Sequence, residues 1–238
     1  MNALIVIPAR YNSQRLPGKP LLLVNGKPLL WWVWKNARRV GIPVVVATDD
    51  ERIRKTATDF GARVVLTSRR HRSGTERVAE VARKILAKII VNWQGDEPLL
   101  SPKLVNHLIK YLARHPREIL VTAARKIFEP AVINDPAVVK VVLDKNNYAL
   151  YFSRAAIPFK RDRKARPIYW KHLGVYVYRN QFLQKLLKTA PTQLEQIEKL
   201  EQLRVLENGW RIKVLPTGYD SIGVDTMDDF RQVCRLLR

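Results

Sequence analysis

Apolar runs typical of buried strands alternate with helical patterns through the first half of the chain, and this alternation constrains the fold more than any other feature. Strands separated by helices indicate βαβ units, which require a mainly parallel sheet. We therefore expect an α/β fold with a mostly parallel, Rossmann-like sheet and helices on both of its faces. The strand-like runs are Ala3–Pro8, Pro43–Thr48, Ala62–Thr67 and Lys88–Trp93.

The middle of the chain differs, because its strand-like runs follow one another with little helical sequence between them. Strands joined without crossover helices pair antiparallel. A polar, proline-containing stretch at residues 158–167 separates the last two runs. We expect one domain over residues 1–238 that carries a partly antiparallel insertion at residues 125–191. The runs are Ile119–Ile127, Val138–Asp144, Tyr148–Phe152 and Trp170–Arg179. Helical patterns then resume, one of them at Thr192–Glu207.

Length and composition suit a soluble protein with a full hydrophobic core. The 238 residues fit one large domain, and 47% of them are hydrophobic. No apolar run approaches the ~18 residues of a membrane span, and no signal-peptide pattern precedes the first strand. Cys234 is the one cysteine, which excludes an intrachain disulfide and a cysteine-based metal cluster. We expect a cytoplasmic protein without membrane insertion.

The net charge of +22, from 43 Lys and Arg against 21 Asp and Glu, raises nucleic-acid binding as one interpretation. The alternative is a charged surface around a site for an anionic substrate. The charge is spread over the chain, and its densest clusters, residues 69–72 and 160–166, lie in expected loops. We expect no specific nucleic-acid partner, although a basic nucleic-acid-binding protein remains an open alternative.

Two acidic segments stand out against this basic background. Gln94-Gly95-Asp96-Glu97 directly follows an apolar run, and Gly223-Val224-Asp225-Thr226 comes near the end of the chain. Residues past the carboxyl ends of strands line the ligand crevice of α/β folds. Mg²⁺ typically takes one or two carboxylates and completes its shell with water and substrate phosphates. The pattern indicates phosphate chemistry with Asp96 and Asp225 as metal ligands.

The segment after the first strand has the composition of a phosphate-binding loop. Arg10, Arg15 and Lys19 fall within ten residues, and Gly18 precedes the last of them. Backbone N–H groups and cationic side chains in such a loop can bind a triphosphate. The loop matches neither the dinucleotide-binding nor the Walker A pattern. A solvated loop in a basic protein is the alternative.

Six motifs in this order resemble the 3-deoxy-manno-octulosonate cytidylyltransferases, also called CMP-KDO synthetases. The resemblance runs from residue 4 to residue 235, although a net charge of +22 departs from that family. The first motif is shared with other sugar nucleotidyltransferases, and the central ones are narrower. The motifs are R-L-P-G-K-P at 15–20, S-G-T-E-R at 73–77, Q-G-D-E-P at 94–98, A-L-Y-F-S-R at 149–154, L-E-Q-L-R at 200–204 and G-V-D-T at 223–226.

The resemblance implies a Mg²⁺-dependent cytidylyltransferase with a nucleotidyltransferase sheet. It would activate 3-deoxy-D-manno-octulosonate (KDO) with CTP, giving CMP-KDO and pyrophosphate for lipopolysaccharide biosynthesis. It also implies a homodimer, with the insertion at 125–191 binding the sugar acid and supporting the dimer.

The resemblance also implies roles for individual residues. Catalysis would involve Arg10, Lys19, Asp96 and Asp225, the last two as metal ligands. The nucleotide would be bound by Pro8, Ala9, Arg10, Arg15, Lys19, Asp49, Ser73, Gln94 and Asp96. The sugar acid would be bound by Arg77, Gln94, Tyr151, Ser153, His172, Glu198 and Gln202.

Several of these residues have structural alternatives. Ser73 fits a helix N-cap, because Glu76 follows it in a capping-box pattern. Glu198 and Gln202 could be a surface pair on one helix face, and His172 could be a hydrogen-bonded core residue. A different cytidylyltransferase, such as a CMP-sialate synthetase, is the nearest functional alternative.

Overall fold

A parallel four-stranded unit forms the amino-terminal half of the protein. The computed structural model describes residues 2–12 and 16–237. β6, β1, β4 and β5 lie side by side in that order, and each neighbouring pair is parallel. The strands are β1 (Ala3–Pro8), β4 (Val44–Thr48), β5 (Arg63–Leu66) and β6 (Ile89–Asn92). The helices between and after them are α1 (Leu29–Arg38), α2 (Glu51–Asp59), α3 (Gly74–Lys84) and α4 (Pro102–Arg114).

The remaining strands extend the same sheet beyond β6. β10 (Tyr169–Arg179) pairs antiparallel with β6 and with β7 (Leu120–Ile127), and β11 (Lys213–Thr217) pairs parallel with β7. The antiparallel hairpin of β8 (Lys140–Leu143) and β9 (Ala149–Ser153) attaches to β10. β10 therefore lies inside the main sheet, while β8 and β9 branch from it. The limits of the insertion at 125–191 stay a prediction.

The short elements complete the chain and fill the connections. β2 and β3 form a separate two-stranded sheet, and the others are helices. They are η1 (Lys19–Leu21), β2 (Leu23–Val24), β3 (Lys27–Pro28), α5 (Pro130–Asn134), α6 (Asn180–Leu186), α7 (Gln193–Glu198), α8 (Leu203–Glu207) and α9 (Met227–Leu236).

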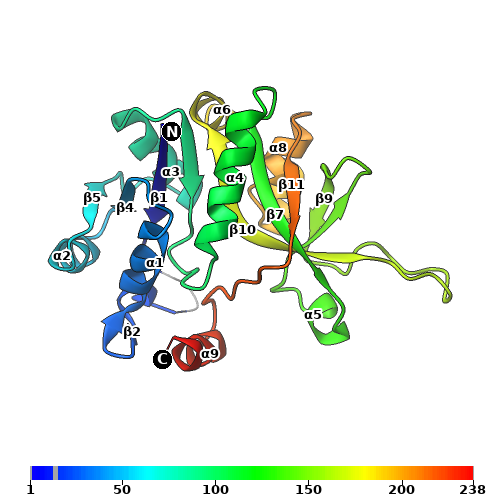
Figure 1. Cartoon of the computed structure of the whole chain (residues 1–238), viewed down its shortest axis with the longest axis horizontal. Helices are drawn as coiled ribbons and strands as arrows, with labels where there is room; N and C mark the ends of the chain where they lie inside the picture. The colour runs from blue at the N-terminus through cyan, green and yellow to red at the C-terminus, as the bar shows by residue number, and fades with distance from the viewer. Residues whose placement is uncertain (1, 13–15, 238) are drawn as a thin grey trace.

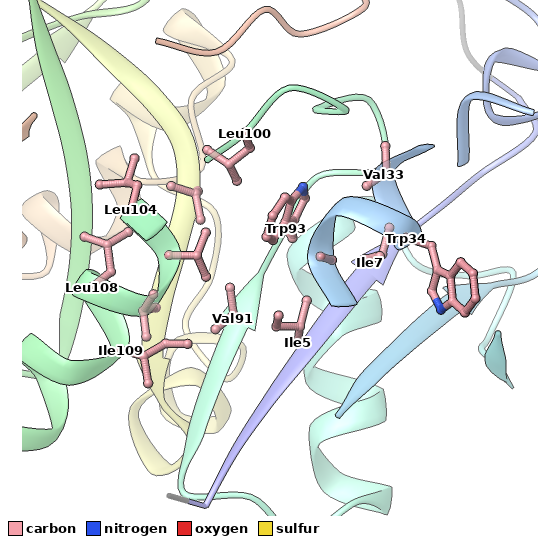
Figure 2. Packing of buried hydrophobic residues seen from close by; sticks show 14 of the residues in the cluster. Ile5, Ile7, Val33, Trp34, Val91, Trp93, Leu100, Leu104, Leu108 and Ile109 are labelled. Carbon is pink, nitrogen blue, oxygen red and sulfur yellow. The ribbon is translucent and has the colours of Figure 1, made fainter. Parts of the chain in front are cut away.

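Helices cover both faces of the sheet, so the predicted α/β fold is confirmed (Figure 1). The alternation along β1 explains the two cores. Ile5 and Ile7 face one side with Val91 and residues of α1 and α4, as Figure 2 shows, while Leu4 and Val6 face the other side with α3 and α6. Side chains on successive strand residues point to opposite faces, which buries β1 on both.

One predicted helix is wrong in its extent. The pattern over Thr192–Glu207 forms two short helices, α7 and α8, because Lys199 adopts a left-handed backbone with φ of 54° and ends the first. Gln202 therefore lies four residues after Glu198 but not on the same helix. The break turns Glu201 and Gln202 toward the region described below.

The segment between β9 and β10 forms an arm that projects from the body beside α5 (Figure 1). Its base is the antiparallel pair of Tyr169 and Ile127. Within the described residues, no helix is both long enough and apolar enough to cross a membrane.

Candidate active site

A hollow of about 330 Å³, called hollow A here, opens where β1 and β6 end. The expected nucleotide-binding residues meet there, apart from two. Arg15 lies outside the described residues. Asp49 does not line the hollow itself but pairs with Arg77, which does. The lining includes Pro8, Ala9, Arg10, Lys19, Ser73, Arg77, Gln94, Asp96, Glu201 and Asp225.

Two glycines allow the loops around hollow A to come together. A side chain at Gly95 would place its Cβ 2.6 Å from the Pro8 carbonyl oxygen, so only glycine lets the loop after β6 lie against the end of β1. Gly18 has φ of 69°, a left-handed conformation that begins η1 and directs Lys19 inward. These contacts explain the glycines of the Q-G-D-E-P and R-L-P-G-K-P motifs.

The two predicted metal ligands converge on one cation, the ammonium of Lys19. Its Nζ lies 2.6 Å from Asp96 Oδ2, 3.2 Å from Asp225 Oδ1 and 2.7 Å from the Val224 carbonyl oxygen. The two loops are also joined directly, because Val224 N donates to Asp96 O at 2.9 Å. Segments far apart in sequence thus present three oxygen atoms to a common point.

This oxygen set suits a hard divalent cation. Carboxylate and carbonyl oxygens are the ligands that Mg²⁺ accepts, with water and phosphates filling the other positions. The described residues contain no group of three or more His, Cys, Asp or Glu that could hold a metal by themselves. A cation at this point would therefore depend on substrate oxygens, and Lys19 would have to release the carboxylates.

Arg77 is buried beside Asp49 in the wall of hollow A. Its guanidinium lies 3.1 Å from Asp49 Oδ2 and donates to Thr67 Oγ1 at 2.5 Å. Ser73 also has a structural contact, since its Oγ accepts from Glu76 N at 3.2 Å as the N-cap of α3. Both residues keep a place in the lining of hollow A, so the cap and a ligand role are compatible.

A second hollow of about 290 Å³, called hollow B here, adjoins the first. The two share Ser73, Gln94 and Glu201 and therefore form one cleft. Of the predicted sugar-binding residues, Gln94, His172 and Gln202 line hollow B, and Arg77 lines hollow A.

The other predicted sugar-binding residues form a cluster around Glu198. Ser153 Oγ donates to Glu198 Oε1 at 2.5 Å, and Arg154 N donates to Glu198 Oε2 at 3.0 Å. Desolvation and Glu198 together raise the pKa of Tyr151. Arg154 Nε also donates to the Glu198 carbonyl oxygen at 2.9 Å, and Arg154 itself lines hollow B. The cluster thus holds Arg154 at the cleft.

His172 is both a core residue and part of the cleft wall. Burial lowers the pKa of His172 to about 3, so the ring is neutral near pH 7. Thr122 Oγ1 donates to the Val175 carbonyl oxygen at 2.7 Å, which leaves it to accept from His172 Nε2 at 3.0 Å. In that tautomer Nδ1 is a hydrogen-bond acceptor.

The sequence model of the family described as "Cytidylyltransferase" matches residues 4–213. This chain belongs to the cytidylyltransferase family.

Relatives in that family align with nearly the whole length of this chain. A Geobacter sulfurreducens protein named 3-deoxy-manno-octulosonate cytidylyltransferase is 47% identical over 100% of both chains. A Shewanella sp. (strain ANA-3) protein named 8-amino-3,8-dideoxy-manno-octulosonate cytidylyltransferase is 46% identical over 98% of this chain and 97% of its own. The structure of a CMP:2-keto-3-deoxy-manno-octonic acid synthetase complexed with CTP is 40% identical, covers 100% of this chain and 98% of its own, and has a TM-score of 0.94. The predicted resemblance is confirmed.

Three residues of this cytidylyltransferase family member escape prediction from sequence. Glu201 lies where hollows A and B join, and desolvation there raises its pKa. Its motif, L-E-Q-L-R, could have indicated it, since it directly precedes Gln202. Arg154 closes the A-L-Y-F-S-R motif. Ser221, which donates to Glu97, follows no sequence signal.

Proposed function

We propose that this protein transfers CMP from CTP to KDO, releasing pyrophosphate. The observation that carries the proposal is the joined cleft: hollow A holds the phosphate-loop cations and the carboxylate pair, and hollow B adjoins it through shared residues. The structure of a CMP:2-keto-3-deoxy-manno-octonic acid synthetase complexed with CTP is 40% identical in sequence, which supports the assignment of both substrates.

Hollow A would bind the nucleotide. Arg10 and Lys19 would contact the phosphates, together with Arg15, and Lys19 would exchange its carboxylate partners for phosphate oxygens. Asp49, Ser73 and the backbone at Pro8 and Ala9 would bind the ribose and base. The negative charge of a triphosphate would give the loop cations several phosphate oxygens as charge-assisted hydrogen-bond partners.

Asp96 and Asp225 would hold Mg²⁺, with the Val224 carbonyl oxygen beside them. When bound, Mg²⁺ supplies compensation for charge on the phosphoryl oxygens and can lower the pKa of a sugar hydroxyl. The chain's own residues supply position and electrostatics, which account for most of the catalysis of phosphoryl-type transfers.

The transfer is a single substitution at the α-phosphorus. The anomeric hydroxyl oxygen of KDO forms the new O–P bond, the bond to the bridging oxygen of pyrophosphate breaks, and the hydroxyl proton leaves to solvent. Lys19 and Arg10 would stabilise the charge that develops on the leaving pyrophosphate. His172, being neutral, would contribute a hydrogen bond to the sugar rather than a charge.

The 8-amino sugar acid is a second candidate substrate, because relatives of similar identity carry that name. Of the charged described residues that line hollow B, Arg154, Lys199 and Arg204 are cations and Glu201 is an anion. This lining favours a sugar acid without an added ammonium, and thus KDO. Sialate is not favoured, since the relatives reported above are named as cytidylyltransferases of octulosonate sugars.

A side-by-side assay tests the choice of sugar. CMP-sugar formation from CTP would be followed chromatographically with KDO, the 8-amino analogue and sialic acid. We expect kcat/KM for KDO to exceed the others by ~10-fold or more, the low end of the discrimination that enzyme pockets achieve between similar substrates. A higher kcat/KM for the 8-amino sugar would assign the second candidate instead.

We further propose a homodimer in the cytoplasm, where CTP is available, with the arm before β10 at the dimer interface. Phe128, at the base of the arm, is 76% exposed, and Phe159, within the arm, is 85% exposed. Glu129, Asp135 and Asp229 line a hollow of about 630 Å³ near that base and could receive the arm's cations from a second copy. Exposed apolar side chains that gather into a contiguous patch commonly mark interaction surfaces.

Changing Phe128 and Phe159 together to Ser should convert the dimer to a monomer, as light scattering would show by a halved mass. Leu86→Ser is the matched control, because Leu86 is 91% exposed in the connection between α3 and β6, outside the arm. A double variant that stays dimeric would place the interface elsewhere.

A further inference from the structure

We propose that Glu97 is a positioning residue: its contact with Ser221 fixes the loop of Asp96 relative to the loop of Asp225. The inference rests on the proposed role of those two carboxylates in metal binding. It assigns a function to the glutamate of the Q-G-D-E-P motif and to a serine outside every motif.

The link joins residues 124 positions apart in the chain. Ser221 Oγ donates to Glu97 Oε2. Glu97 directly follows Asp96, and Ser221 lies four residues before Asp225. The Trp93 indole N–H donates to the Glu97 carbonyl oxygen at 3.0 Å and fixes the backbone of the same loop. The side-chain link thus adds to the backbone contact between Val224 and Asp96.

The Glu97 carboxylate lies close to two glycines, Gly223 and Gly174. A Cβ at Gly223 would lie 3.2 Å from Glu97 Oε1, and a Cβ at Gly174 would lie 3.6 Å from the same atom. The first distance is tighter than ordinary contact, so Gly223 allows the Asp225 loop to close onto Glu97. This gives the glycine of the G-V-D-T motif a packing role.

Ser221 is in turn anchored to the sheet. Lys171 of β10 donates to the Ser221 carbonyl oxygen at 2.9 Å and to Asp220 Oδ1 at 2.9 Å. Arg125 of β7 contacts Asp220 as well. Ser221 is buried, and β7 and β10 pair along much of their length. The Asp225 loop is therefore held by rigid strands, and Glu97 connects the Asp96 loop to that anchor.

The arrangement matters for metal binding because the two carboxylates come from separate loops. Metal affinity depends on hydrogen-bonded neighbours that hold the ligands at their spacing, and loss of such a neighbour typically costs about 10- to 100-fold. Besides the Glu97–Ser221 contact, the backbone hydrogen bond from Val224 to Asp96 and the Lys19 contacts connect the two loops, and Lys19 is expected to leave when CTP binds.

The test measures Mn²⁺ binding to the full-length protein with CTP present and the sugar omitted, by electron paramagnetic resonance. Ser221→Ala should weaken Mn²⁺ affinity ~10-fold, and Ser221→Thr, which keeps a hydroxyl, should restore most of it. Glu97→Leu should weaken affinity similarly, and adding Ser221→Ala to it should cause little further loss. Such non-additivity identifies a direct coupling.

Two controls separate this role from others. Tyr148→Phe removes a comparable contact, in which the Tyr148 hydroxyl donates to the Glu118 carboxylate. Tyr148 lies beside Lys213 at the start of β11, so this variant should leave Mn²⁺ affinity unchanged. Asp96→Asn should abolish Mn²⁺ binding; if it does not, the proposed metal site is wrong and the positioning role falls with it. If Asp96→Asn abolishes binding but Ser221→Ala changes only the thermal midpoint, the metal site stands and the positioning role is overturned.

Discussion

Replacing Asp96 or Asp225 by Asn is expected to lower turnover by about 100-fold or more while leaving the fold intact. Each change removes a hard anionic ligand from the point where Lys19 Nζ now lies, 2.6 Å from one carboxylate and 3.2 Å from the other. The amide keeps the size of the side chain but not its charge. Initial rates of pyrophosphate release over a Mg²⁺ titration measure the loss.

Asp228→Asn is the matched control for this prediction. Asp228 lies on α9, its side chain is 88% exposed, and it contacts Arg231 on the helix surface. We expect this variant to keep wild-type kinetics. Near-wild-type kcat for Asp96→Asn or Asp225→Asn at saturating Mg²⁺ would show that the residue concerned does not bind the metal.

Lys19→Ala should lower kcat/KM for CTP by about 100-fold, the typical cost of losing one donor that stabilises transition-state charge. Part of the loss should be in kcat, because charge on the leaving pyrophosphate grows as the bond breaks. The same variant should bind Mn²⁺ more tightly without nucleotide, since the ammonium no longer competes for Asp96 and Asp225.

Lys27→Ala controls for the loss of a cation from this basic protein, because Lys27 is exposed on β3. If Lys19→Ala and Lys27→Ala gave the same kinetics, the loop after β1 would be a solvated surface loop. Lower turnover together with tighter Mn²⁺ binding in Lys19→Ala would show that Lys19 contacts the phosphates and does not serve only as a structural ion pair.

The parallel half of the fold could be predicted from sequence because local patterns determine it. Each strand there is a short apolar run that a helix follows, and Ser73 and Ser101 cap helices where the sequence indicates. The break at Lys199 could not be predicted, because neither glycine nor proline marks it. Tertiary packing of Leu200 and Leu203 in the core outweighs the helical pattern there.

The candidate site divides in the same way. Many residues of hollow A lie just after β1 or β6 or near the start of α3, so the sheet determines their positions. Residues from the α7–α8 region and from the segment after β11 reach the cleft through turns, where spacing in sequence carries little information. Glu198 was therefore expected at the sugar, while the structure places Glu201 at the cleft and Glu198 against Arg154.

Pyrophosphate release from CTP and Mg²⁺, measured with and without KDO and repeated with ATP and GTP, tests the central claim most directly. We expect rapid release only when CTP and KDO are both present, and CMP-KDO as the second product. Release from CTP at the same rate without KDO, comparable turnover of a purine triphosphate, or no release with CTP and KDO together would contradict the proposed function.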